Sequence, residues 1–259
     1  MKSLLSIALF LLGATLSAQS ELPSPYRNQL TLTVGLNQGY LKDENFSPLH
    51  YSSGGLRLGL GYRRNTKNGD RWHAEIGAGL LKIRTNGKKV AFTNRYLIDL
   101  AVGYRKGISP ADADKRFFVG GNYRTYVDLT LFDESEAVTF FGLHGFEVAA
   151  DADWKTGKRQ RLRAGLAVPV FAQLVRPPYT GWDKFIVDNA DNIPRVLTRG
   201  TWTSLNAFTG LRAEFGWAYQ ASDRWTLEAN YALAYYATQR LDPVRSLNNQ
   251  FALKTTFNY

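Results

Sequence analysis

Phe251-Ala-Leu-Lys-Thr-Thr-Phe-Asn-Tyr259 is the last stretch of the chain, and it decides the fold. In an extended strand, successive side chains point to opposite faces. One face would therefore carry Phe251, Leu253, Thr255, Phe257 and Tyr259, and the other would carry Ala252, Lys254, Thr256 and Asn258. The alternation predicts a β-strand with one apolar face and an aromatic residue at its end.

The same two-residue period recurs through the chain upstream of this strand. Its first example is 30–36, where the apolar face would hold Leu30, Leu32, Val34 and Leu36. About ten segments show the pattern, namely 30–36, 56–62, 72–79, 96–105, 117–129, 140–154, 162–170, 205–219, 225–237 and 251–259. None shows a sustained period of 3.6 residues, so the sequence predicts an all-β chain.

Residues 1–18 have the features of a secretory signal peptide: a basic Lys2, an apolar run that ends at Leu12, and small residues at Ser17 and Ala18. We expect cleavage after Ala18, which leaves 19–259 as one β-barrel domain. An uncleaved membrane anchor is the alternative, but the apolar run is short for spanning a bilayer. The chain has no cysteine, which excludes disulfides, a thiol nucleophile and a thiolate metal site.

The face opposite the apolar one carries charged side chains among many glycines and alanines. These candidate lumen-lining residues are Arg57, Glu75, Asp99, Arg124, Asp128, Glu147, Arg163, Arg212, Glu214 and Glu228. Small residues beside long charged ones suit a crowded polar lumen in which ion pairs fill the space. Aromatic residues of the apolar face collect at strand ends, as in the two girdles of a transmembrane barrel. Since lipid offers no water to unpaired strand edges, such a sheet must close on itself.

We therefore predict a closed antiparallel up-and-down transmembrane β-barrel of about ten strands, with eight or twelve strands as alternatives. A soluble, lipocalin-like barrel with an apolar interior is the competing interpretation. Pro169 lies within a predicted strand, and a closed barrel has no free edge to accommodate a residue without an N–H donor. We expect a β-bulge near Val168–Pro169.

The signal peptide, the alternating segments, the aromatic girdles and the terminal aromatic residue together resemble the small outer-membrane β-barrel proteins of Gram-negative bacteria. In that family the last strand is recognised by the barrel-assembly machinery, and Phe257 and Tyr259 match its apolar and aromatic positions. Leu253 and Thr255 stand where a polar residue and a glycine are usual. The resemblance implies export to the bacterial outer membrane, insertion by that machinery, and a monomer.

The connections between predicted strands give an orientation. If the first strand runs outward from the periplasm, the periplasmic connections are short and turn-like, at 63–71, 105–116, 154–161 and 220–225. The outer connections would be generally longer, at 38–54, 84–95, 129–139, 176–203 and 238–249. Short periplasmic turns and longer outer loops are typical of such barrels. The chain would then end in the periplasm.

The formal net charge is +10, but the basic residues are spread along the chain and do not form a single stripe. No nucleic-acid-reading module accompanies them, so we expect no nucleic acid among the partners. Many basic residues lie beside turns, which favours contact with anionic lipid head groups and lipopolysaccharide. We expect no cofactor and no metal site.

The lumen of a barrel of about ten strands leaves little room beyond its own side chains. We therefore predict a largely plugged polar lumen and a structural or surface-interaction role, with Tyr179, Trp182 and Phe185 in an outer loop as the binding surface. A narrow channel or transporter for small polar or anionic solutes is the alternative, and its bore would be lined by four arginines: Arg57, Arg124, Arg163 and Arg212.

An enzymatic activity is the less favoured interpretation. His50 and Ser52 have the His-x-Ser spacing of outer-membrane lipid hydrolases, and residues i and i+2 of a strand share a face. However, no acidic partner for His50 is evident, and the pair is expected at the end of the first outer loop. Asp151 and Asp153 would lie at the periplasmic end, whereas proteases of the omptin type need their aspartates at the outer rim.

Overall fold

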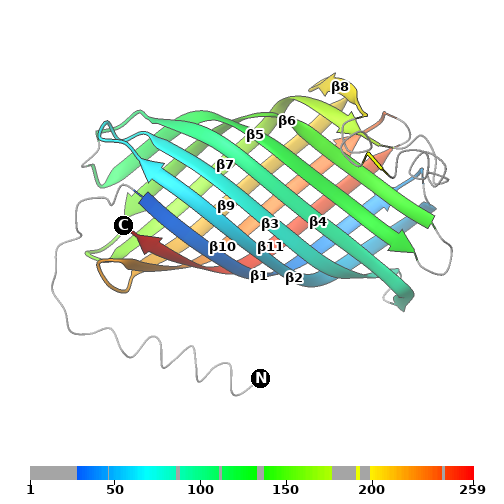
Figure 1. Ribbon diagram of the computed structural model, residues 1–259, viewed down its shortest axis with the longest axis horizontal. Helices are drawn as coiled ribbons and strands as arrows, with labels where there is room; N and C mark the ends of the chain where they lie inside the picture. Colours follow the sequence, from blue (N-terminus) through cyan, green and yellow to red (C-terminus); the bar gives the residue numbers. More distant parts are fainter. Residues whose placement is uncertain are drawn as a thin grey trace, which may run out of the picture.

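The computed structural model describes residues 28–45, 47–85, 88–110, 113–132, 137–176, 191–192, 199–240 and 243–259. The predicted signal peptide lies outside these residues. Tilted strands form an elongated barrel, with the C-terminus beside the start of β1 (Figure 1). The strands are β1 (Asn28–Asp43), β2 (Ser47–Asn65), β3 (Arg71–Thr85), β4 (Lys88–Gly107), β5 (Lys115–Phe132), β6 (Ala137–Lys155), β7 (Gln160–Val175), β8 (Thr201–Ser204), β9 (Phe208–Gln220), β10 (Trp225–Thr238) and β11 (Val244–Asn258).

Every neighbouring pair of strands is antiparallel, and the sheet closes where β11 pairs with β1 in the register Leu30↔Phe257. Two strands share one edge of β7. The short β8 pairs with Phe171–Leu174, and β9 pairs with Gln160–Ala167. β8 and β9 are thus two parts of one strand that a turn interrupts at 205–207. The result is the predicted ten-strand barrel with one extra short strand, and the fold prediction is confirmed.

The apolar residues of the predicted alternating segments point outward, as the sequence predicts. Leu36, Leu56 and Leu253 are 62%, 63% and 70% exposed. On β3 this outward apolar band runs from Trp72 to Leu80. Its length matches the roughly 9–11 residues that a tilted strand needs to cross a bilayer. In the part of the chain that the structure describes, no helix is long and apolar enough to span a membrane.

The strands continue past this band at one end of the barrel, which corrects the predicted connections. The structure has connections at 44–46, 86–87, 133–136 and 239–243 where the sequence predicted much longer loops, and only 176–200 is long. We call the end of the barrel that carries these five connections the loop end. The opposite, turn end has connections at 66–70, 108–114, 156–159 and 221–224. Ladder pairing at the loop end continues beyond the band, for example at Lys82↔Asn94, into residues that the hydropathy pattern had indicated as loop.

The turn at 66–70 shows how the turn end is fixed. Gly69 has a φ of 87°, a left-handed conformation that glycine adopts without steric cost. The Thr66 N–H donates to the Asp70 carbonyl over 2.8 Å. The Asp70 carboxylate accepts from the Tyr104 hydroxyl at 2.7 Å and from the Gly107 N–H at 3.0 Å. These donors hold the pKa of the Asp70 carboxyl below its usual value, the Tyr104 hydroxyl contributing most.

Pro169 lies at an irregularity of β7. The β6 partner of Pro169 is Glu147, but the next residue of β6 toward the loop end, Phe146, pairs with Phe171, so Val170 is the extra residue. The structure therefore has the predicted β-bulge, centred one residue further along the chain. The bulge reverses the alternation of β7. It also separates the part of β7 that pairs with β9 from the part that pairs with β8.

Candidate functional site in the barrel lumen

The lumen near the loop end is filled by apolar side chains. This apolar layer consists of Leu41, Tyr51, Leu81, Ile83, Leu97, Tyr126, Phe141, Leu143, Ala172, Leu174, Phe208, Tyr236 and Val244. The Tyr236 ring is 1% exposed, and its centroid lies 5.0 Å from that of Tyr126 and 5.9 Å from that of Phe208. Side chains from all around the barrel thus meet inside it.

This layer was not predicted from the sequence, because the inward and outward faces exchange polarity along the strand. On β3, the outward Leu80 is followed by the inward Leu81, and beyond this doublet the outward residues are Lys82 and Arg84. The inward Ile83 is 1% exposed. The part of β3 toward the turn end therefore has its apolar residues on the outward face, and the part toward the loop end has them on the inward face. The signal that could have found the layer is the Leu80-Leu81 doublet followed by a new alternation.

Arg95 of β4 crosses the lumen directly beside the apolar layer and is 0% exposed. Its Nε donates to Asp128 Oδ1 over 2.8 Å, and its Nη2 forms an ion pair with the same carboxylate. Its Nη1 donates to Ser53 Oγ at 3.0 Å, and its Nη2 donates to Ser246 Oγ at 3.1 Å. Gly39 leaves room for the guanidinium, because a Cβ there would lie 2.6 Å from Nη1. Asp128 was predicted from the sequence to line the lumen, whereas Arg95 was predicted in the 84–95 connection.

Arg176 anchors the start of the long 176–200 connection at the loop end. Its side chain is fully buried, and its Nη2 forms an ion pair with Asp43 of β1. Its Nη1 donates to the carbonyl of Arg240, in the connection before β11, over 3.1 Å. Three distant parts of the chain therefore meet at this mouth of the barrel.

Arg95, Asp128, Ser53 and Ser246 form what we call the Arg95 cluster. On the turn-end side of this cluster, charged side chains of alternating sign form a series of ion pairs across the lumen. Arg57 Nη2 lies 2.9 Å from Asp99 Oδ2, and Arg124 forms an ion pair with the other oxygen of Asp99. The Arg124 Nε donates to Glu147 Oε2 over 3.1 Å. All four side chains are at most 15% exposed. Since each buried charge contacts an opposite one, the desolvation cost of burying it is offset.

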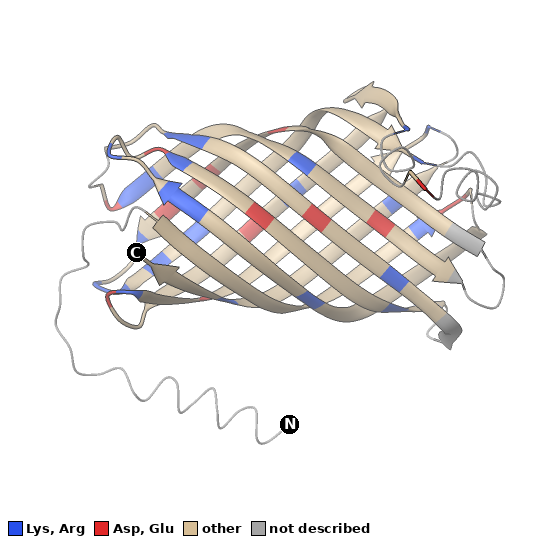
Figure 2. Ribbon diagram, viewed as in Figure 1, with Lys and Arg blue, Asp and Glu red and all other residues tan. Residues whose placement is uncertain are grey.

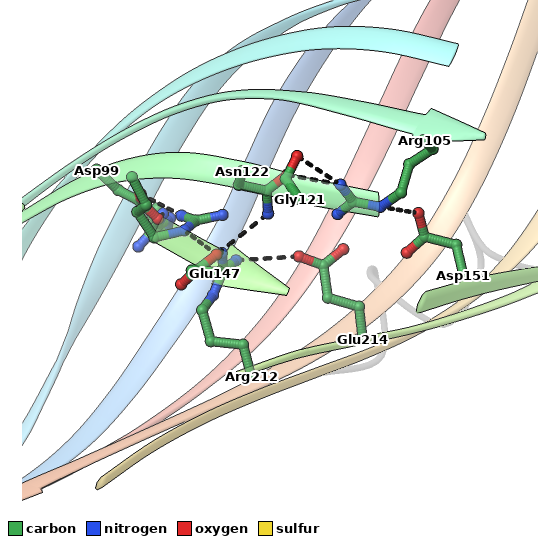
Figure 3. Close-up of polar contacts among 10 residues, drawn as sticks. Asp99, Arg105, Gly121, Asn122, Glu147, Asp151, Arg212 and Glu214 are labelled. Carbon is green, nitrogen blue, oxygen red and sulfur yellow. Dashed lines mark hydrogen bonds and ion pairs between the residues drawn. The ribbon is translucent and has the colours of Figure 1, made fainter. Parts of the chain in front are cut away.

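The series of ion pairs continues on the far side of the barrel. Arg212 Nη1 lies 3.9 Å from Glu147 Oε2, and its Nη2 donates to Glu214 Oε1 at 3.2 Å. Figure 3 shows Arg212 beside both Glu147 and Glu214. Lys254 of the terminal strand lies 3.5 Å from Glu214 and 4.0 Å from Glu228. The inward face of the closing strand therefore joins the charged network of the lumen.

Two glycines let these side chains pass over intervening strands. Arg57 reaches Asp99 across β3 at Gly77, where a Cβ would lie 3.0 Å from Arg57 Nη2. Glu228 reaches Arg163, with Oε2 2.6 Å from Nη1, across β9 at Gly216. A Cβ at Gly216 would lie 2.5 Å from Glu228 Oε1. Small residues in the lumen thus provide the space in which long charged residues pair.

Two further ion pairs lie toward the turn end. Arg105 donates from Nε to Asp151 Oδ2 over 2.8 Å and from Nη1 to Asn122 Oδ1 over 2.8 Å, as Figure 3 shows. Arg71 Nη2 lies 2.5 Å from Asp153 Oδ2. The Arg71 guanidinium also lies 3.6 Å from the centroid of the Phe118 ring, which gives a cation–π contact. Asp151 and Asp153 therefore both neutralise arginines at this end.

A polar cavity of about 190 Å³ lies between the apolar layer and the turn end. Eight of the predicted lumen residues line it: Arg57, Glu75, Asp99, Arg124, Arg163, Arg212, Glu214 and Glu228. Asp128 lies in the Arg95 cluster, and Glu147 is buried in the series of ion pairs. Glu75 is an exposed residue although it faces inward, so water reaches this part of the lumen.

The other candidate residues are not brought together. His50 and Ser52 are in β2 and not in a loop, and they share its outward face. The Ser52 hydroxyl donates to the carbonyl of Arg84 at 3.5 Å and not to His50. The Thr85 hydroxyl donates to the backbone carbonyl of His50 at 3.3 Å, but no side chain among the described residues bonds to the His50 imidazole. Within the same residues, no group of three or more His, Cys, Asp or Glu residues could hold a metal. Tyr179, Trp182 and Phe185 lie outside the described residues.

Comparison with known proteins shows similarity of fold alone. No family model matches the chain, and no curated protein matches it. Among solved structures, the outer-membrane protease OmpT from Escherichia coli has a TM-score of 0.53 at 6% sequence identity, covering 94% of this chain and 99% of that one. The translocator domain of the autotransporter NalP from Neisseria meningitidis has a TM-score of 0.46 at 10% identity, covering 100% and 96%. The chain thus has the fold of Gram-negative outer-membrane β-barrel proteins.

Proposed function

We propose that this chain is an integral outer-membrane barrel whose lumen is closed to solutes, with a structural or surface-interaction role. The observation that carries the closed lumen is the apolar layer, in which Leu81, Leu97 and Tyr236 are each at most 1% exposed. The membrane location is supported by the outward apolar band and by exposed aromatics at its turn-end edge, such as Trp72 and Trp225. The surface-interaction role rests on the aromatic residues that the sequence places in the 176–203 segment.

The narrow-channel alternative is less well supported by the geometry. A solute path through the barrel would have to cross both the apolar layer and the Arg95 cluster. The arginines expected to line a bore instead form ion pairs, for example Arg57 with Asp99 and Arg163 with Glu228. Opening a path would separate buried charges from their partners, which costs several kcal/mol per ion.

We expect the purified wild-type barrel to give no reproducible conductance steps in planar bilayers. Replacing two rings of the apolar layer together with the arginine beside it, in a Phe141→Ala/Tyr236→Ala/Arg95→Ala variant, should create unitary steps because both barriers lose their largest central side chains. Phe146→Ala is the matched control, since Phe146 lies on the outward face of the same strand as Phe141 and is 55% exposed. Steady wild-type steps that change size in Arg212→Gln would contradict the closed lumen and support the channel.

The partners that we propose are anionic lipid head groups, above all the phosphates of lipopolysaccharide at the loop end. Lys82, Arg84 and Arg245 project outward just beyond the apolar band and are exposed. Acidic head groups at that level would pair with them, and each basic residue near an anionic surface contributes about 1 kcal/mol. The barrel closes within one chain through β1 and β11, which supports a monomer inserted by the barrel-assembly machinery.

Lipopolysaccharide should raise the free energy of unfolding of the wild-type barrel, obtained from urea titration in detergent micelles. In a Lys82→Gln/Arg84→Gln variant, we expect this gain to fall by about 2 kcal/mol, following the value per basic residue. Lys67→Gln/Lys115→Gln removes the same charge at the turn end and should keep the full gain. Equal losses in the two variants would show a general charge effect and would rule out a loop-end site.

The lipid-hydrolase alternative has no support in the geometry. A serine nucleophile requires a hydrogen bond to its base, and the base requires an orienting acid. Ser52 donates to a backbone carbonyl instead. We therefore favour a barrel without hydrolytic activity at His50 and Ser52.

A further inference from the structure

We propose that the lumen cavity binds a small oxyanion, a phosphate or carboxylate group, at Arg63 and that the anion enters from the turn end. This site goes beyond the proposed structural role. A closed barrel needs no ligand for that role, but its polar half retains a hydrated chamber. At roughly 30 Å³ for each water in the liquid, about 190 Å³ holds about six waters or one hydrated oxyanion.

Basic residues outnumber acidic ones in the lining of this cavity. The basic residues are Arg57, Arg63, Arg71, Arg105, Arg124, Arg163, Arg212 and Lys254, and the acidic ones are Glu75, Asp99, Asp151, Asp153, Glu214 and Glu228. Most of the basic side chains have a carboxylate within 4 Å. Arg63 differs, because no ion pair of Arg63 exists among the described residues. Its five N–H donors are thus the largest unsatisfied donor group in the lining.

Two further arginines of the lining each have an N–H donor without a hydrogen-bond partner among the described residues. Arg71 uses Nη2 for Asp153, and Arg163 uses Nη1 for Glu228. The Nε atoms of both are buried and have no hydrogen-bond partner among the described residues. Arg63 and Arg163 both lie within electrostatic range of Arg71. Arg71 is therefore repelled by two further guanidinium groups, and an added anion would relieve that repulsion.

The route into the cavity favours anions. Since the apolar layer fills the loop end, access is from the turn end, close to Thr31 and Thr256 in the lining. The basic residues of the turn-end rim are Arg64, Lys67, Lys106, Lys115, Lys155, Lys158, Arg159 and Arg224, against Asp70, Asp114 and Asp223. Figure 2 shows basic residues concentrated at this end of the barrel. A rim of one sign raises the local concentration of ions of the other sign.

An oxyanion fits this donor set better than a cation does. Guanidinium groups present flat pairs of N–H donors that match two oxygens of a phosphate or carboxylate. A cation would instead have to approach between positively charged side chains. Two carboxylates within electrostatic range of Arg63 are also already engaged, Asp151 with Arg105 and Asp153 with Arg71. Among the described carboxylates of the lining, Glu75 alone has no ion pair.

The test is calorimetric titration of the full folded barrel in detergent with inorganic phosphate, at constant ionic strength maintained with chloride. We expect saturable binding by the wild type. In Arg63→Gln the affinity should fall by about tenfold or more, because the charge-assisted hydrogen bonds are lost. Arg64→Gln is the matched control: it is the next residue, it removes the same charge, and it is exposed on the outward face. Its affinity should stay within about twofold of the wild type.

Folding of each variant is checked by its heat-modifiable electrophoretic mobility. Arg63→Lys provides a second variant, which keeps the positive charge but lacks the planar pair of N–H donors. It should bind phosphate with intermediate affinity. No saturable binding by the wild type, or equal weakening in Arg64→Gln and Arg63→Gln, would overturn the site.

Repeating the titration in phosphatidylglycerol nanodiscs shows whether the oxyanion comes from a lipid head group or from free solution. Loss of phosphate binding there supports a lipid head group as the ligand, and unchanged binding supports a free anion. A conducting wild-type barrel would contradict the closed lumen without affecting this result.

Discussion

Replacing Arg95 by methionine is expected to destabilise the folded barrel by about 3–5 kcal/mol, the cost of leaving a buried charge without its partner. Arg95 is 0% exposed and Asp128 is 4% exposed. Methionine fills part of the space but leaves the Asp128 carboxylate in a region that water does not reach. It also removes the donors to Ser53 and Ser246. The loss is large because Arg95 connects β4 with strands on the other side of the lumen.

Equilibrium urea unfolding in lipid vesicles, followed by tryptophan fluorescence, measures this loss. Arg95→Met/Asp128→Leu should recover most of the stability, since apolar residues can replace a buried ion pair at little cost. Arg84→Met is the matched control, because Arg84 is outward-facing and exposed in the neighbouring strand, and it should change stability by less than about 0.5 kcal/mol. A single Arg95→Met variant as stable as the wild type would contradict the cross-lumen role of Arg95.

The part of the fold that could be predicted is the part governed by the two-residue period. The terminal strand has the predicted outward face and pairs with the strand that contains Leu30. The bulge beside Pro169 also followed from local chemistry, because a residue without an N–H cannot complete a ladder inside a closed sheet. Each of these conclusions needs only a few consecutive residues and the geometry of a strand.

The apolar layer could not be predicted in the same way, because its strands change environment along their length. Beyond Leu80 the outward residues of β3 are the polar Lys82 and Arg84, while the inward residues are buried. A single rule for which face is apolar therefore fails at the Leu80-Leu81 doublet. The rule correctly finds the segment with an outward apolar face, and it assigns the remaining part of the strand to a loop.

Partners across the lumen were equally beyond the sequence pattern. Alternation puts Arg57 and Asp99 on inward faces, but it contains no information about which inward residues meet. That depends on the closure of the barrel and on Gly77, which leaves the path between them open. Arg63 shows the same limit. The sequence predicted it in the 63–71 connection, whereas it lies on the inward face of β2, and the absence of an ion pair among its described neighbours depends on the whole lumen.

Leu58→Arg should destabilise the barrel in phospholipid vesicles by about 2–4 kcal/mol, the cost of an arginine on the lipid face near the bilayer midplane. Leu58 is 58% exposed and lies in the middle of the outward apolar band of β2. His50→Arg provides the matched control. His50 is exposed on the outward face of the same strand but lies beyond the band, so its replacement should change stability by less than about 0.5 kcal/mol.

The difference between these two variants discriminates between a membrane barrel and a water-soluble one. Both positions are exposed on one face of one strand, so in water both substitutions would place arginine in solvent at little cost. Only a lipid environment around the band makes Leu58 different from His50. Equal urea midpoints for the two variants in vesicles would therefore contradict membrane insertion of the band. A large loss in Leu58→Arg alone would locate the hydrocarbon core at the level of Leu58 and leave the loop end of β2 in water.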